Sequence, residues 1–184
     1  AARACRAALR CQRKLEERRA DFEQRAGMVL RARIGLNTGE AIVGNMGSRE
    51  RFNYTILGDA ANLASRLEGA NKAFGTYLMV SENTWRLSGG NWAGRELACL
   101  RVVGRKTAVR VYELAGFSGE PRPESWSGFE NARSLFAQGR FDEARALFEQ
   151  WPADAAACAY VEKCRSLATC PPAPWTGIWE LGEK

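Results

Sequence analysis

One stretch constrains the fold more than any other. Residues 53–68 read N-Y-T-I-L-G-D-A-A-N-L-A-S-R-L-E. The apolar and β-branched residues before Gly58 predict a strand, and the alanines and leucines after it predict an amphipathic helix. Gly58 interrupts the strand pattern, and Asp59 is a residue type suited to capping a helix N-terminus. We therefore expect a strand that passes directly into a helix capped by Asp59.

Polar side chains gather around this expected junction. Asn62 and Arg66 are four residues apart, so they project from one helix face about one turn apart. Thr55 lies at the end of the preceding strand. The amide can donate and accept hydrogen bonds, and the guanidinium has a planar fork that suits phosphate oxygens. Spacing alone favours a simpler interpretation, a surface helix with polar residues facing water, because short motifs often match by chance.

A longer pattern resembles a known family. Residues 34–48, I-G-L-N-T-G-E-A-I-V-G-N-M-G-S, and residues 51–68 are similar to the C-terminal half of a bacterial class III adenylate/guanylate cyclase catalytic domain. The similarity extends from about residue 4 to residue 114 and is densest over residues 33–74. The residues in register with the family are Gly35, Asn37, Gly39, Gly44, Gly47, Tyr54, Gly58, Asn62 and Arg66.

The resemblance implies an adenylate cyclase that converts ATP to 3′,5′-cyclic AMP and pyrophosphate in intracellular signalling. It implies that Asn62 orients the ribose and that Arg66 neutralises charge on the phosphoryl group in the transition state. Thr55 would contact the purine, and a threonine there favours adenine. The segment V-V-G-R, which ends at Arg105, resembles a V-K-G-K segment whose lysine contacts the triphosphate. Val103 replaces the first lysine, and a solvated turn explains Arg105 equally well.

The resemblance also implies Mg²⁺ or Mn²⁺ as cofactor. The family's two metal-binding aspartates precede the similar region, so we expect the ligands in a missing N-terminal half and assign no metal ligand here. Each family active site forms between two protomers, so the partners implied are ATP and a second copy in a homodimer. We expect the isolated chain to be inactive and its full-length parent to be the enzyme. The chain starts without methionine, inside a helical pattern, which indicates a fragment that an upstream sensor or membrane anchor could precede.

Charge and composition exclude other classes of protein. Lys+Arg 27 against Asp+Glu 21 gives a net charge of +6, and residues 1–33 hold ten basic and four acidic residues. No set of aromatic stacking residues interleaves with these arginines, which favours a solvated helix face over a nucleic-acid site. The absence of histidine excludes histidine-based triads and imidazole metal ligands. The six cysteines form no C-x-x-C pair and no apolar run reaches membrane-spanning length, so we expect reduced thiols in a cytoplasmic protein.

The periodicity predicts an α+β fold, and the resemblance implies a partial ferredoxin-like cyclase domain with a mixed sheet over residues 1–115. We expect one helix over residues 2–25 that ends at Gly27, and a hairpin of strands 30–36 and 40–45 followed by an exposed turn at 49–51. The later elements expected are a strand at 77–80, a helix at 81–87 capped by Ser81, and strands at 95–103 and 109–114.

The C-terminal part is expected to be helical. Residues 116–128 are rich in proline, glycine and serine and read as a linker. Residues 129–184 resemble a tetratricopeptide-like tail, with a helical hairpin that turns at Gly139, a third helix over 154–168, and an extended end. One repeat cannot bury its own apolar face, so the tail should dock on the cyclase domain or on a partner. Two alternatives stay open: a non-catalytic cyclase-like regulatory or dimerisation module, and a helical-repeat interaction protein.

Overall fold

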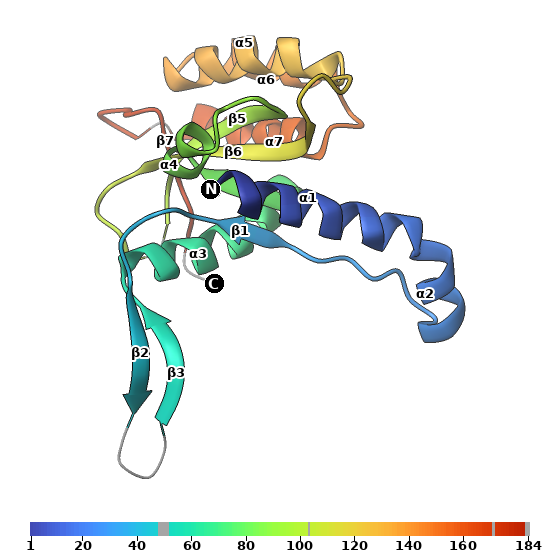
Figure 1. Cartoon of the computed structure of the whole chain (residues 1–184). Helices are drawn as coiled ribbons and strands as arrows, with labels where there is room; N and C mark the ends of the chain where they lie inside the picture. Colours follow the sequence, from blue (N-terminus) through green and yellow to red (C-terminus); the bar gives the residue numbers. More distant parts are fainter. Residues whose placement is uncertain (48–51, 103, 171, 183–184) are drawn as a thin grey trace.

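A computed structural model of the chain describes residues 1–47, 52–102, 104–170 and 172–182. These residues form a five-stranded mixed sheet in the order β1-β4-β6-β5-β7 (Figure 1). The bounds are β1 (Ile34–Leu36), β4 (Leu78–Ser81), β5 (Trp92–Arg101), β6 (Val109–Phe117) and β7 (Ile178–Glu180). The β1–β4 and β5–β7 pairs are parallel, whereas β6 runs antiparallel to β4 and β5. The predicted α+β class is confirmed.

A separate two-stranded ribbon projects from the body of the molecule (Figure 1). It consists of β2 (Ile42–Gly47) and antiparallel β3 (Phe52–Leu57). The predicted hairpin of strands 30–36 and 40–45 is therefore wrong. Hydrogen bonds from the Asn37 amide to the Ala60 carbonyl and from the Asn83 amide to the Thr38 carbonyl hold residues 37–38 against two helices, so the chain does not reverse there. The expected turn at 49–51 lies outside the described residues.

Helices cover both faces of the sheet. Helix α1 (Ala2–Glu17) packs Cys5, Ala8 and Leu9 against a cluster that includes Leu78 and Val80 of β4. Because alternate strand residues face opposite ways, the intervening Met79 belongs to the core on the other face. The predicted 2–25 helix is interrupted at Arg18, after which α2 (Arg19–Ala26) continues to Gly27.

Helix α3 (Asp59–Phe74) lies unusually close to β1. A Cβ atom on Gly35 would lie 2.2 Å from the Ala64 carbonyl oxygen and 2.3 Å from the Glu68 amide nitrogen. Such distances are far inside van der Waals contact, so the backbones can approach this closely only because residue 35 has no side chain. Gly35 thereby fixes where α3 sits on the sheet.

The elements between α3 and residue 117 follow the predictions closely. Helix α4 (Glu82–Leu87) begins after Ser81, whose hydroxyl accepts a hydrogen bond from the Thr84 amide at 3.3 Å. The predicted strands at 77–80, 95–103 and 109–114 correspond to β4, β5 and β6, the last two being displaced or extended by a few residues.

The C-terminal helices share a core with the sheet. They are α5 (Ser125–Ala137), α6 (Phe141–Phe148) and α7 (Ala155–Thr169), and the chain turns between the first two at Gly139, with φ 80°. The residues of this shared core that come from the tail include Phe129, Ala132, Phe136, Phe141, Ala144, Phe148, Tyr160 and Trp179. The tail therefore docks on the sheet of its own chain. Its likeness to a tetratricopeptide repeat stays a prediction.

The end of the chain is extended, as predicted, and it is also attached to the sheet. After α7 the chain returns to the sheet, where β7 adds to the edge of β5 in parallel. Only residues 118–124 separate β6 from α5, so much of the predicted linker lies inside regular structure. No helix in the described ranges has both the length and the apolar composition needed to cross a bilayer.

Candidate functional site

The N-terminal half of α3 carries the predicted pair. Asn62 and Arg66 are both exposed, whereas Leu63 and Leu67 beside them are 5% and 0% exposed. The leucines therefore hold the helix on the core while the amide and the guanidinium face solvent on the same side. Within the described part of the chain, neither side chain has a recorded hydrogen-bond or ion-pair partner. The structure thus brings the two together, as predicted, and leaves them available to a ligand.

The start of α3 differs from the prediction. Gly58, with φ 141°, is the N-cap, and Asp59 is the first helical residue, with no side-chain capping bond. The predicted capping role of Asp59 is wrong, because the glycine alone can adopt the left-handed conformation at that position. Instead, Asp59 Oδ2 lies 3.0 Å from Nη2 of Arg105. A carboxylate in the first turn is also favoured by the helix dipole.

Arg105 is brought to the same end of α3. It lies in the turn between β5 and β6, and its side chain is 27% exposed. Its ion pair with Asp59 places the guanidinium one helical turn from Asn62, because residues three apart are neighbours on a helix surface. Three of the predicted side chains therefore lie along one side of α3: Asn62, Arg66 and Arg105. Val103, which replaces the first lysine of the resembling segment, lies outside the described residues.

A hollow of about 300 Å³ opens beside Arg105. The residues lining it are Asn37, Thr38, Gly39, Glu40, Asp59, Ala60, Leu63, Ser81, Asn83, Arg105 and Val109. Its floor is held by side-chain hydrogen bonds: the Ser81 hydroxyl donates to Asn37 Oδ1 at 2.7 Å, and the hydroxyls of Thr38 and Thr84 are 3.0 Å apart. Sequence patterns gave Asn37 and Thr38 no role in a site. The only signal for them was the N-T-G sequence at residues 37–39, which resembled the family.

Thr55 lies apart from this hollow. It is exposed on β3, opposite Gly44, and is not among the residues that line the space beside Arg105. Since β3 passes through Gly58 into α3, Thr55 still belongs to the same junction. The structure therefore places Thr55 in the middle of the ribbon, two residues before β3 ends, and does not join it to Arg105.

The ribbon itself exposes large apolar side chains on both faces. Cross-strand register places Ile42 and Leu57 on one face and Val43, Tyr54 and Ile56 on the other. These side chains are 50–75% exposed. A lone two-stranded hairpin is marginally stable in water, and exposed apolar patches of this kind mark interaction surfaces. The described residues of the ribbon therefore form an exposed apolar surface of the kind that marks interaction sites.

The chain belongs to a known enzyme family, as a sequence comparison shows. The family model described as "Adenylate and Guanylate cyclase catalytic domain" matches residues 2–115. This chain is a member of that family. The similarity predicted from the motifs is thereby confirmed, and α5–α7 and β7 lie outside the matched residues.

Several known cyclases are similar to this one. Adenylate cyclase 1 of Rhizobium meliloti (strain 1021) is 41% identical over 113 residues, 59% of this chain, and an adenylate cyclase of Anabaena cylindrica is 32% identical over 88 residues, 44% of this chain. The matches span only 17% of the length of either relative. A solved bacterial light-regulated adenylyl cyclase superimposes with a TM-score of 0.53 and 29% identity, over 64% of this chain and 34% of that one.

The donor groups of the described residues are too dispersed to form a metal site. Residues 1–47, 52–102, 104–170 and 172–182 contain no group of three or more acidic, histidine or cysteine side chains that could hold a metal ion. Mg²⁺ and Mn²⁺ prefer several oxygen ligands, chiefly carboxylates. The donor set described here does not fit such an ion, so no catalytic step is assigned to a metal bound by these residues.

Proposed function

We propose that this chain supplies the ribose- and phosphate-binding half of an adenylate cyclase active site. The observation that carries the proposal is the exposure of Asn62 and Arg66 on one face of α3, above buried Leu63 and Leu67. Solvent-facing side chains at fixed positions on a well-packed helix are suited to holding a substrate, because the core prevents the helix from shifting. The family membership and the similar adenylate cyclases support the same conclusion.

In the reaction, one bond to the α-phosphorus of ATP forms and another breaks. The ribose 3′-oxygen gives its proton to water and bonds to the α-phosphorus, while the bond from that phosphorus to the bridging oxygen breaks and pyrophosphate leaves. Asn62 hydrogen-bonds the ribose and fixes the attacking oxygen in line with the leaving group. Arg66 donates to the phosphoryl oxygens, whose negative charge it stabilises as the bonds change. Arg105 binds the triphosphate, and Thr55 contacts the adenine.

The active protein is proposed to be a homodimer, with its site at the interface. The apolar faces of the β2–β3 ribbon are the surface that a second copy would cover. The carboxylates for Mg²⁺ or Mn²⁺ come from a polypeptide segment other than residues 1–184, which therefore make no cyclic AMP alone. We place the reaction in the cytoplasm, where ATP is available, in a protein to which an upstream sensor or membrane anchor could belong.

The test is made on the protein expressed from the complete gene. Formation of cyclic AMP from ATP, and of cyclic GMP from GTP, is measured with Mg²⁺ and with Mn²⁺. Arg66→Ala should lower kcat on ATP about 100-fold, the size of effect seen when one donor to a developing oxyanion is removed. Lys72→Ala, which removes an exposed cation from the last turn of the same helix, is the matched control and should keep wild-type turnover.

One result would overturn the proposal: an Arg66→Ala protein as active as the Lys72→Ala control. A second outcome would favour a non-catalytic dimerisation module, for which the exposed ribbon is the supporting observation. In that case the wild-type protein would dimerise yet form neither cyclic nucleotide with either metal.

A further inference from the structure

Strand β7 joins the sheet beside the end of β5. It pairs with the last three residues of β5, in the register Cys99↔Ile178, Leu100↔Trp179 and Arg101↔Glu180. The Leu181 amide donates to the Arg101 carbonyl at 3.1 Å, and the Arg101 and Glu180 side chains form an ion pair. The family match ends at residue 115, so this strand is an addition specific to the C-terminal tail.

The same strand also contacts the helix that carries the proposed site. Trp179 is 6% exposed, and its ring centroid lies 4.7 Å from that of Phe74, the last residue of α3. Tyr160 of α7 also packs on the indole, with 4.7 Å between the two ring centroids, and lies beside Phe74. Aromatic pairs at such distances add to the energy of burial and restrict how the rings can move. β7 therefore holds both the end of β5 and the end of α3.

Arg105 links the same two elements, β5 and α3. Arg105 follows the end of β5 by four residues, and its guanidinium forms the ion pair with Asp59 at the start of α3. An ion pair with an exposed carboxylate contributes little by itself, since both groups are hydrated and screened. The position of Arg105 must then depend on how firmly the backbone before it is held. Pairing with β7 supplies that restraint at residues 99–101.

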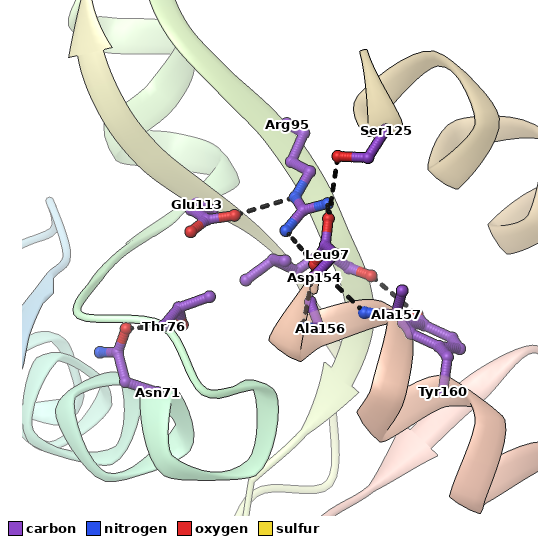
Figure 2. Close-up of polar contacts among 10 residues, drawn as sticks. All are labelled: Asn71, Thr76, Arg95, Leu97, Glu113, Ser125, Asp154, Ala156, Ala157 and Tyr160. Atoms are coloured by element: carbon purple, nitrogen blue, oxygen red, sulfur yellow. Dashed lines mark hydrogen bonds and ion pairs between the residues drawn. The ribbon is translucent and has the colours of Figure 1, made fainter. Parts of the chain in front are cut away.

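The tail that carries β7 is itself fixed to the sheet. Figure 2 shows Arg95 of β5 held by two carboxylates, Glu113 of β6 and Asp154 at the start of α7. Close by, a Cβ atom on Gly75, which ends α3, would lie 2.5 Å from the Cβ of Ala155. The first residues of α7 therefore contact both β5 and the end of α3. The tail cannot move against the sheet without breaking these contacts.

We propose that β7 is a positioning strand for the triphosphate site: residues 178–181 hold the end of β5 so that Arg105 is directed at the phosphates of the nucleotide. That the ligand is a nucleoside triphosphate rests on the proposed function. That β7 restrains residues 104–108 does not depend on it. The strand touches no substrate. It acts through Arg105, and so it should affect the binding of phosphates more than the rate of the chemical step.

The test uses two mild variants of the protein expressed from the complete gene. Leu181→Pro removes the amide that donates to Arg101, since proline has no N–H group. Glu180→Gln removes the ion pair with Arg101. Glu162→Gln is the matched control, because it makes the same change in an exposed Arg–Glu pair on α7, with Arg165. A third variant that ends at Thr176 removes β7 entirely.

The first readout is amide hydrogen exchange, which needs no activity. Leu181→Pro should speed exchange at residues 99–101 and 104–108 about tenfold, as expected when a local opening becomes easier by one backbone bond, whereas Glu162→Gln should leave it unchanged. Circular dichroism confirms that each variant is folded. Unchanged exchange at residues 104–108 in folded Leu181→Pro would overturn the positioning role, whether or not the protein proves to be a cyclase.

The second readout separates binding from chemistry. In Leu181→Pro, KM for ATP and the inhibition constant of inorganic tripolyphosphate should both rise about tenfold, the loss expected for one charge-assisted contact, with kcat changed less than the KM. The inhibition constant of adenosine, which has no phosphates, should not change. A fall in kcat with no effect on tripolyphosphate would show that β7 is merely structural. Should the variant that ends at Thr176 not fold, Leu181→Pro and Glu180→Gln still decide the question.

Discussion

Replacement of Asp154 tests how the tail is joined to the sheet. The Arg95 side chain is 3% exposed and that of Asp154 is 9% exposed, and Arg95 Nη2 donates to Asp154 Oδ1 at 2.9 Å. The same carboxylate caps α7, accepting from the amides of Ala156 and Ala157 at 3.0 and 3.3 Å. One residue thus combines a buried charge pair with a helix cap, and two substitutions can separate them.

The expected losses follow from those contacts. Asp154→Asn keeps a capping oxygen and removes the charge, so Arg95 retains only Glu113; we expect a loss of about 3 kcal/mol, the lower end for breaking a buried ion pair. Asp154→Ala also removes the cap, which adds about 1 kcal/mol. The free energy of unfolding is measured by urea denaturation, followed by circular dichroism and tryptophan fluorescence. Glu162→Ala, in an exposed pair, is the control and should lose less than about 0.5 kcal/mol.

The pH dependence gives an independent check. Burial alone would raise the pKa of Asp154, but the hydrogen bonds and charge of Arg95, with the two capping amides, lower the pKa below its ordinary value. An acid with a depressed pKa stabilises the fold above its unfolded pKa, about 3.9, and loses that contribution as the pH falls through the folded value. The stability difference between wild type and Asp154→Asn should therefore shrink below about pH 4.

Glu113 has the opposite effect on how the stability of the fold depends on pH. Burial raises the pKa of Glu113, and Arg95 offsets the rise only in part, so ionisation of Glu113 opposes folding as the pH increases through that raised pKa. The charge of Asp154 is one cause of the raised pKa of Glu113, so Asp154→Asn also lowers that pKa, and the comparison removes the contribution of Glu113 only in part. The reasoning fails if Asp154→Asn loses less than about 1 kcal/mol at pH 7, a value typical of an exposed pair, or if the difference between the two proteins does not vary with pH.

Three further predictions concern other parts of the chain. Gly35→Ala should prevent folding or lower the thermal midpoint sharply in a melting curve, since its methyl group would meet the α3 backbone at 2.2 Å; a midpoint within about 2 °C of wild type would contradict this. Replacing both Tyr54 and Ile56 with Asp should give a monomer by sedimentation with an unchanged melting curve, whereas a persistent dimer would place the interface elsewhere. The purified 184-residue chain should form no cyclic AMP from ATP with Mn²⁺ above a protein-free blank, and measurable synthesis would refute the proposed division of the active site.

The sequence was most informative where local patterns decide the structure. The strand–glycine–helix junction at residues 52–74, the cap at Ser81 and the helices on either side of Gly139 are set by neighbouring residues, and all are present. Periodicity places Asn62 and Arg66 on one face for the same reason. Their proposed roles, in contrast, came from the family resemblance.

The predictions from sequence fail where contacts between residues far apart in the chain decide the structure. Residues 34–36 pair with β4 and not with the strand that follows them, because side chains from α4 and the end of β4 bind residues 37–38. Strand β7 has only three residues and no periodicity, and its position depends on an open edge of β5 that local sequence cannot reveal. Asp59 is a residue type that often caps helices, yet Gly58 is the N-cap of α3 and Arg105 binds the Asp59 carboxylate.

The aromatic core shared by α3, β5 and the C-terminal helices also bears on how such proteins can be recombined. Phe74 and Leu97 lie within residues 2–115, whereas Phe136, Tyr160 and Trp179 lie beyond them, and all belong to one buried cluster. A chimera that grafts residues 2–115 of another cyclase onto this tail would join two half-cores whose shapes were never fitted to each other. A breakpoint after residue 182 would keep this shared core intact, so productive exchange of catalytic units should be found there and not at the edge of the sequence family.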